Sequence, residues 1–209
     1  MRRLAAIVLF AWVFLEAGWA VTSPRPAWAY PEPAIVSPSW SLDIQVQAPE
    51  AISIQDVDGS IRWFWYITYK VVNPTDQDLL FIPEITVAND RGEIITAGEN
   101  VPPTVFPAIK KRLGNPLLLS PVQVVGKLLQ GEDFAREGVA IWPAPGGDVD
   151  AFSVFIAGLN GETQNITNPI TGESVLVRRT LMLDYKSPGN FKRPQDQPII
   201  ADGQREVMR

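Results

Sequence analysis

The side chains on which most catalytic and transition-metal sites depend are missing from this sequence. Its 209 residues include no histidine and no cysteine, so the nitrogen and sulfur ligands that zinc and copper prefer are absent. The base that usually activates a serine or cysteine nucleophile is absent as well. Neither the glycine-rich dinucleotide-binding fingerprint nor the P-loop pattern occurs. The sequence therefore predicts no cofactor and selects no catalytic or metal-binding residue.

Carboxylates remain, and three pairs of aspartates stand in expected turns with one residue between the two members. The pairs are Asp56 and Asp58, Asp76 and Asp78, and Asp148 and Asp150. Calcium binds several oxygen ligands from a flexible loop, but no glutamate follows at the distance that an EF-hand requires. We favour the alternative, in which each aspartate forms its turn by bonding its own backbone.

Paired acids could also hydrolyse a glycosidic bond. Such an enzyme holds two carboxylates about 5 to 9.5 Å apart across a cleft. Glu84 and Asp184 are candidates, although nothing in the sequence selects this pair over others.

Aromatic side chains offer a third chemistry, because sugar-binding sandwiches use exposed rings as flat platforms. Trp63, Trp65, Tyr66 and Trp142 are candidates for such a platform. Their regular alternation favours core packing over exposure, since buried aromatics dominate core energetics. Phe64 and Tyr66 lie on a mixed strand face and would be the more informative pair if exposed. Phe64, Tyr66 and Trp142 are therefore the predicted ligand or partner contacts.

One stretch, residues 60–74, organises the elements that would position these side chains. It is rich in β-branched and aromatic residues, which suit a pleated surface. Side chains alternate between the two faces of a strand, and one face here is wholly apolar or aromatic. That face carries Ile61, Trp63, Trp65, Ile67, Tyr69 and Val71. The stretch predicts a central strand of about 40 Å, long enough that we expect a bend or bulge in it.

The rest of the chain predicts an all-β fold, an immunoglobulin-like two-sheet sandwich with one short helical insertion. The apolar spacing over 105–113 predicts the helix, with Thr104 as its N-cap and Gly114 as its C-terminal stop. Residues 120–129 are ambiguous between a helix and a strand. Further strands are expected at 40–48, 51–55, 79–88 (with Pro83 at a bulge or edge), 93–97, 137–142, 149–159 and 175–185, and residues 195–209 either add an edge strand or fray.

The N-terminal residues resemble a secretory signal peptide. Arg2 and Arg3 precede an apolar run at 4–15, and small residues permit cleavage after Ala20 or Ala29. An uncleaved membrane anchor is the alternative, but the run is shorter than the roughly 20 residues of a span. We predict a secreted or periplasmic protein with no membrane span after cleavage. The predicted organisation is a signal peptide at 1–29, a proline-rich lead-in at 30–39 and one β-sandwich domain at 40–209.

Four segments carry a resemblance to a known family. They are ITYKVVNPTDQDLLFIPEITVANDRGEI, VFPAIKKRLGNPLL, LLQGEDFAREGVAIWP and RTLMLDYKSPG. They resemble an uncharacterised family of exported bacterial β-sandwich proteins. That family has no assigned activity, so the resemblance implies export and architecture and no functional residue.

Three hypotheses about function follow. The first is a non-catalytic exported sandwich that acts through contacts with an envelope protein. The second is a carbohydrate-binding module that binds polysaccharide on exposed aromatics, and the third is a glycoside hydrolase with paired carboxylates. The formal net charge of -5 gives no reason to expect nucleic acid as a partner, because nucleic-acid binding needs clustered Lys and Arg.

Overall fold

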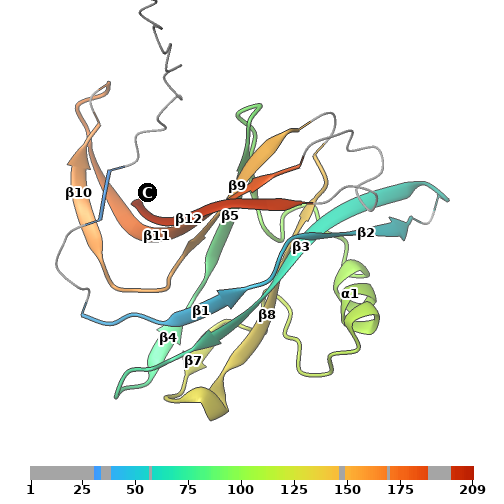
Figure 1. The fold of residues 1–209 in the computed structure, drawn as a ribbon, viewed down its shortest axis with the longest axis horizontal. Helices are drawn as coiled ribbons and strands as arrows, with labels where there is room; N and C mark the ends of the chain where they lie inside the picture. Colours follow the sequence, from blue (N-terminus) through green and yellow to red (C-terminus); the bar gives the residue numbers. More distant parts are fainter. Residues whose placement is uncertain (1–30, 34–38, 57, 146–148, 169, 188–198) are drawn as a thin grey trace, which may run out of the picture.

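The protein is an all-β sandwich with a single α-helix among the residues that its structure describes (Figure 1). This structure is a computed structural model. The described residues are 31–33, 39–56, 58–145, 149–168, 170–187 and 199–209. Two antiparallel sheets pack face to face and a two-stranded sheet joins them at one end. The predicted fold class is thus confirmed, while the immunoglobulin-type connectivity stays a prediction.

The predicted central strand is confirmed as β3 (Ile61–Val72). On one edge β3 pairs with β8 (Arg136–Pro143). On the other edge it pairs first with β2 (Glu50–Gln55) and then with β1 (Asp43–Val46). The register with β8 runs without a shift, so the expected bulge is not found there. Two short partners in succession cover the length of this long strand instead.

The second sheet has six strands, and β11 lies at its centre. The strands follow the order β10-β11-β9-β5-β6, and β12 also pairs with β11. A β-bulge between Asp184 and Tyr185 interrupts the pairing of β11 with β12. The strands are β5 (Glu84–Asn89), β6 (Ile94–Thr96), β9 (Ala151–Ala157), β10 (Thr163–Thr167), β11 (Ser174–Lys186) and β12 (Ile200–Met208).

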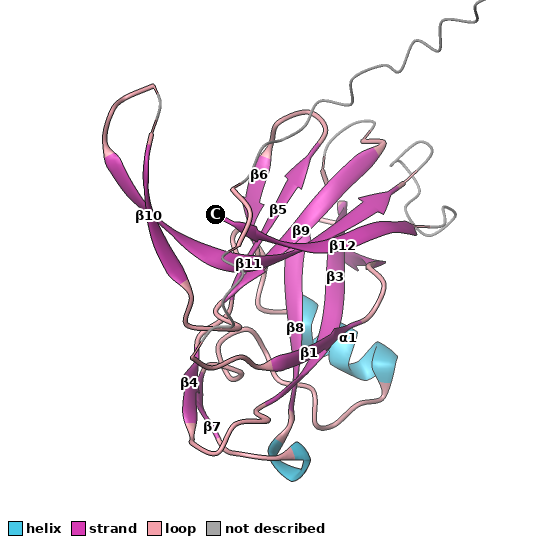
Figure 2. Ribbon diagram, turned by 60° about the vertical axis from the view of Figure 1, so that its left-hand side comes forward, coloured by secondary structure: helices cyan, strands magenta, loops and turns pink. Residues whose placement is uncertain are grey.

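The two-stranded sheet pairs β4 (Leu79–Phe81) with β7 (Gly126–Leu128). The single strand predicted at 79–88 is wrong, since β4 and β5 belong to different sheets. Pro83 separates them because it cannot donate to a ladder. The ambiguous stretch at 120–129 therefore contains turns followed by a strand, and no helix. Figure 2 shows this small sheet at the end of the molecule away from the marked C-terminus, next to the 3-10 turn η1 (Glu132–Phe134).

The main core lies between the two large sheets and takes the apolar face of β3. Trp65 and Ile67 are fully buried there, whereas Trp63 is half-buried. The ring of Phe152 packs edge-on against Trp65, with centroids 5.6 Å apart, and stacks on Tyr185 at 5.3 Å. These aromatic contacts tie the centre of the first sheet to the second sheet.

Helix α1 (Val105–Leu113) covers the outer face of the first sheet. Its Val105 and Ile109 pack on Phe64 and Tyr66 in a second buried cluster. The predicted stop is confirmed, since Gly114 adopts the left-handed conformation with φ 61° and its N–H bonds the Lys111 carbonyl. Thr104 occupies the N-cap position but makes no side-chain capping bond.

The two ends of the described chain meet at the edge of the second sheet. The N–H of Met208 donates to the Pro31 carbonyl at 2.9 Å. In the described segments, no helix has the length and apolar character that a membrane crossing demands. The predicted signal peptide at 1–29 and most of the lead-in at 30–39 lie outside the described residues.

Candidate functional site

The three predicted contact residues are core residues. Phe64, Tyr66 and Trp142 are each buried, because α1 covers Phe64 and Tyr66 while Trp142 faces the main core. The Tyr66 hydroxyl donates to Glu50 at 2.6 Å, and burial, followed by this bond, raises the pKa of Tyr66 far above its ordinary value. These side chains form no exposed platform, so a carbohydrate cannot bind on the three predicted contact residues.

The aspartate pairs act in turns and ion pairs. The Asp58 carboxylate accepts from the Ser60 hydroxyl at 2.6 Å and from its N–H at 2.9 Å, and these bonds lower the pKa of Asp58. The Asp56 carboxylate pairs with Arg62 at 3.4 Å. Asp148 lies outside the described residues. Within the described ranges, no three His, Cys, Asp or Glu side chains gather as a metal site would require.

Glu84 and Asp184 are too far apart for a glycosidase. Both stand beside β9, where Glu84 is opposite Ala157 and Asp184 is opposite Ser153. Four residues along a strand separate them by about 13 Å, beyond the roughly 9.5 Å limit for paired catalytic carboxylates. The backbone spacing of this candidate pair therefore does not match that of a glycosidase.

The sheet of β4 and β7 presents an apolar surface to solvent. Leu79, Phe81 and Leu128 point into the core, so alternation turns their neighbours outward. Pairing places Leu80 opposite Lys127, and Ile82 and Val125 are the residues next to the last pair, Phe81 and Gly126. We call this surface the apolar face. Its members, with their exposed fractions, are Leu80 (64%), Ile82 (55%), Val125 (42%) and Leu129 (38%).

Acidic side chains lie in the turns next to the apolar face. Asp78 pairs with Lys127 at 2.7 Å, and this bond lowers the pKa of Asp78. Asp76 and Asp133 are exposed in the turns beside β4 and β7 and make no ion pair with another described residue. Because exposed apolar clusters with polar rims mark interaction sites, the apolar face is the first candidate.

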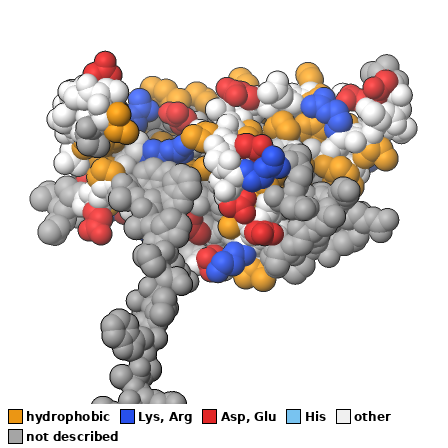
Figure 3. All heavy atoms as spheres, turned by 90° about the horizontal axis from the view of Figure 1, so that it is seen from above, with side chains coloured by type: hydrophobic (Ala, Val, Ile, Leu, Met, Phe, Trp, Pro, Cys, Tyr) orange, Lys and Arg blue, Asp and Glu red, His pale blue; other side chains and the backbone are white. Residues whose placement is uncertain are grey.

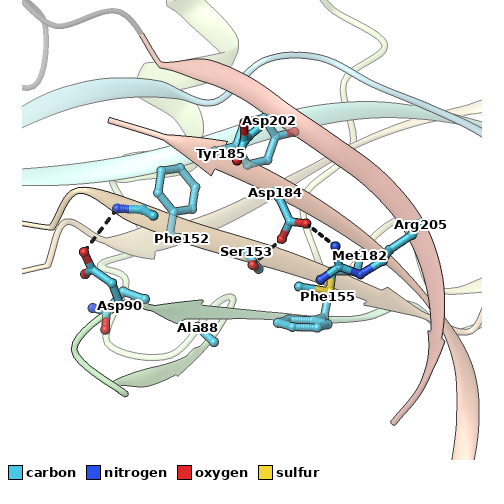
Figure 4. A pocket seen from close by; sticks show the side chains of 12 residues that line it. Ala88, Asp90, Phe152, Ser153, Phe155, Met182, Asp184, Tyr185, Asp202 and Arg205 are labelled. Carbon is cyan, nitrogen blue, oxygen red and sulfur yellow. Dashed lines mark hydrogen bonds and ion pairs between the residues drawn. The ribbon is translucent and has the colours of Figure 1, made fainter. Parts of the chain in front are cut away.

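A second candidate is a hollow on the outer face of the six-stranded sheet (Figure 4). We call it the outer hollow and define it by an apolar floor and a polar rim. The rim centres on Asp184, whose carboxylate accepts from the Ser153 hydroxyl at 2.5 Å and from the Arg205 guanidinium at 2.9 Å. The floor consists of Ala88, Phe155 and Met182.

Charges of both signs mix on the surface. Figure 3 shows Lys and Arg side chains lying beside Asp and Glu side chains on the face seen from above, where grey atoms do not cover it. The same mixing holds on the second sheet, where Arg178 pairs with Glu84 at 3.6 Å. The visible part of this face has no broad basic area.

Comparisons with known proteins identify no relative. The chain matched no family model, no curated protein and no solved structure. The resemblance to an uncharacterised exported family therefore stays a prediction. The two candidate surfaces are the features that bear on function.

Proposed function

We propose that the protein is an exported, non-catalytic β-sandwich that binds another protein in the cell envelope through its apolar face. The observation that carries the proposal is the exposure of Leu80 on β4 and of Ile82 directly after it, at 64% and 55%. The other side of β4 is already packed into the core. Large apolar side chains gathered on one surface gain free energy when a partner removes them from water.

The charge around the apolar face indicates the kind of partner. Asp76 and Asp133 are exposed beside it. The two neighbouring cations are already engaged, since Lys127 pairs with Asp78 and the Arg136 guanidinium donates to the Val124 and Lys127 carbonyls. An anionic lipid surface would be repelled by this rim. A protein with an apolar patch edged by Lys or Arg would be attracted, and electrostatic complementarity of this kind speeds association and fixes orientation.

The position of the apolar face is consistent with such a partner. The chain enters the domain at Pro31, which is bonded to Met208, and Figures 1 and 2 place β4 and β7 at the opposite end of the molecule. The apolar face therefore lies away from the point at which Pro31 is bonded to β12.

The test compares a patch variant with a matched control in affinity capture from the native envelope. The patch variant combines Leu80→Thr and Ile82→Thr. The control combines Ile61→Thr and Ile94→Thr, both 66% exposed and outside the apolar face. Since a Leu or Ile side chain is worth about 1.5–3 kcal/mol when fully buried, losing two partly buried ones should weaken binding roughly thirtyfold or more.

The expected result is one stoichiometric protein that the wild type and the control retain and the patch variant loses. Less of this protein should be retained as salt is added, because salt screens the attraction between the acidic rim and a basic partner. Equal capture by all three proteins, or retention on polysaccharide with no protein recovered, would contradict the proposal. Thermal unfolding of both variants checks that each remains folded.

A further inference from the structure

The outer hollow is a binding site of a different kind, and we infer that it holds a neutral hydroxylated ring such as one sugar unit of a glycan. It lies on the six-stranded sheet, away from β4 and β7. The helix α1 covers the other sheet. On this face the apolar cluster of Phe155, Met182 and Val207 is buried by neighbouring side chains and, among the described residues, by no helix. The inference stands independently of the protein-binding proposal.

The size and floor of the outer hollow suit a single small ring. Its volume is about 210 Å³, below the roughly 300–1,000 Å³ of pockets for drug-sized ligands. At its base Ala88 from β5 is half-buried, next to the buried Phe155 from β9 and Met182 from β11. The Arg209 guanidinium lies over the Phe155 ring, 4.1 Å from its centroid. Figure 4 shows the side chains of this floor and rim. The C–H face of a sugar ring can pack on the floor while its hydroxyls reach the rim.

The rim places a hydrogen-bond acceptor beside a donor. A carboxylate has about four acceptor positions, and the described residues use two of them on Asp184, through Ser153 and Arg205. The Arg205 guanidinium has five N–H donors and is half exposed. Two neighbouring hydroxyls of a sugar could therefore donate to Asp184 and accept from Arg205, as bidentate recognition requires.

The charge of the outer hollow favours a neutral ligand over an anionic one. Three carboxylates, Asp90, Asp184 and Asp202, line it together with one guanidinium, Arg205. Counting Lys186, which pairs with Asp202 at 2.6 Å, three negative and two positive charges leave a net charge of −1. A ligand that carries a carboxylate would be repelled, whereas hydroxyl groups add no charge.

Methionine methyl groups provide a direct measurement of binding. The described residues hold two methionines, Met182 at the floor of the outer hollow and Met208, which is fully buried elsewhere. The protein labelled with ¹³C at methionine methyl groups is titrated with glucose, galactose and N-acetylglucosamine, with glucuronate as the anionic comparison. We expect a saturable shift of the Met182 signal with at least one neutral sugar, a smaller response to glucuronate, and an unchanged Met208 signal.

Two rim variants separate binding from general perturbation. Asp184→Asn and Arg205→Gln should each weaken the affinity tenfold or more, because each removes half of the paired acceptor and donor. Glu84→Gln, which removes a carboxylate outside the outer hollow on the same sheet, should bind as the wild type does. The unchanged Met208 signal verifies that each variant is folded, and Arg205→Gln, at an exposed edge-strand position, serves if Asp184→Asn does not fold.

A second experiment, sedimentation with insoluble cell-wall glycan, distinguishes a free saccharide from a polymer as the ligand. Binding to free sugar alone indicates a soluble saccharide, and sedimentation with glycan that rim variants abolish indicates a polymer; both outcomes support the inference. No saturable Met182 shift with any neutral sugar, together with no rim-dependent sedimentation, would overturn it. An equal affinity in the wild type and both rim variants would overturn it as well.

Discussion

Replacing Gly138 by alanine tests whether the two central strands pack as described. Gly138 of β8 stands directly opposite Tyr69 of β3, and the phenol ring of Tyr69 lies over it. A Cβ atom added at Gly138 would be 2.5 Å from Cζ, 2.6 Å from the hydroxyl oxygen and 2.7 Å from Cε2 of Tyr69. Tyr69 is buried in the main core, so its ring cannot move aside without displacing neighbours.

The structure sets the size of the expected loss. Extra atoms forced into a packed core cost about 1–3 kcal/mol. For a chain of this length each kcal/mol lowers the melting temperature by about 2–4 °C, so Gly138→Ala should melt about 2–12 °C lower than the wild type. The matched control is Gly203→Ala on the edge strand β12, where the nearest atom to an added Cβ, in Asp184, is 3.8 Å away. It should change stability by less than about 0.5 kcal/mol.

Thermal and urea unfolding, followed by tryptophan fluorescence, measure both variants. The same substitution in a Tyr69→Leu background should cost less, because the ring that it strikes is gone, and the difference is the coupling energy of the pair. A Gly138→Ala protein as stable as the wild type, or an equal cost in both backgrounds, would refute the described packing of β3 on β8.

Three further predictions concern local structure. Gly158→Ala should lower stability by about 2 kcal/mol or more, since Gly158 has φ +85° and an added Cβ would be 2.4 Å from the Ile82 carbonyl oxygen; an unchanged urea midpoint would contradict this. Burial raises the pKa of Tyr66, so the free energy of unfolding should be highest below about pH 10 and fall as the pH rises toward the pKa in the folded protein. This fall should be smaller in Tyr66→Phe. Equal falls in the wild type and the variant would contradict the role of Tyr66. Lys127→Met should raise the pKa of Asp78 toward its ordinary value, because the bond from Lys127 lowers it, and an unshifted carboxyl titration by NMR would exclude that role.

Local signals in the sequence were enough to predict most of the individual elements. The alternation over 60–74 predicted β3, and Gly114 marked the end of α1. The turn at 89–92 is equally local, since the Asn89 side-chain oxygen accepts from the Arg91 and Glu93 N–H groups. Each of these depends on residues within a few positions of one another, where turn chemistry and strand period act.

The burial of Phe64 and Tyr66 could not be read from local patterns. Their strand face looked mixed because Arg62, Thr68 and Lys70 share it, yet α1 folds back and covers only the aromatic part. Sequence alternation reports which residues share a face, but the element that covers that face is chosen by tertiary packing.

Both candidate surfaces arise from contacts between distant segments. Leu80 and Val125 share the apolar face only because β4 pairs with β7. The local apolar run at 79–82 predicts part of a single strand and gives no sign of that pairing. The outer hollow combines β5, β9, β11 and β12. The sequence does not predict β10, because its polar residues show no apolar alternation. It becomes a strand only through its pairing with β11.

Site-specific photo-crosslinking in intact cells tests most directly whether the apolar face is the binding surface. A benzophenone amino acid replaces Leu80 in one variant and Ile61 in another, two positions of nearly equal exposure at 64% and 66%. Irradiation should join the Leu80 variant to a single envelope protein and leave the Ile61 variant free. Adducts that are the same at both positions, or none at position 80, would contradict the account.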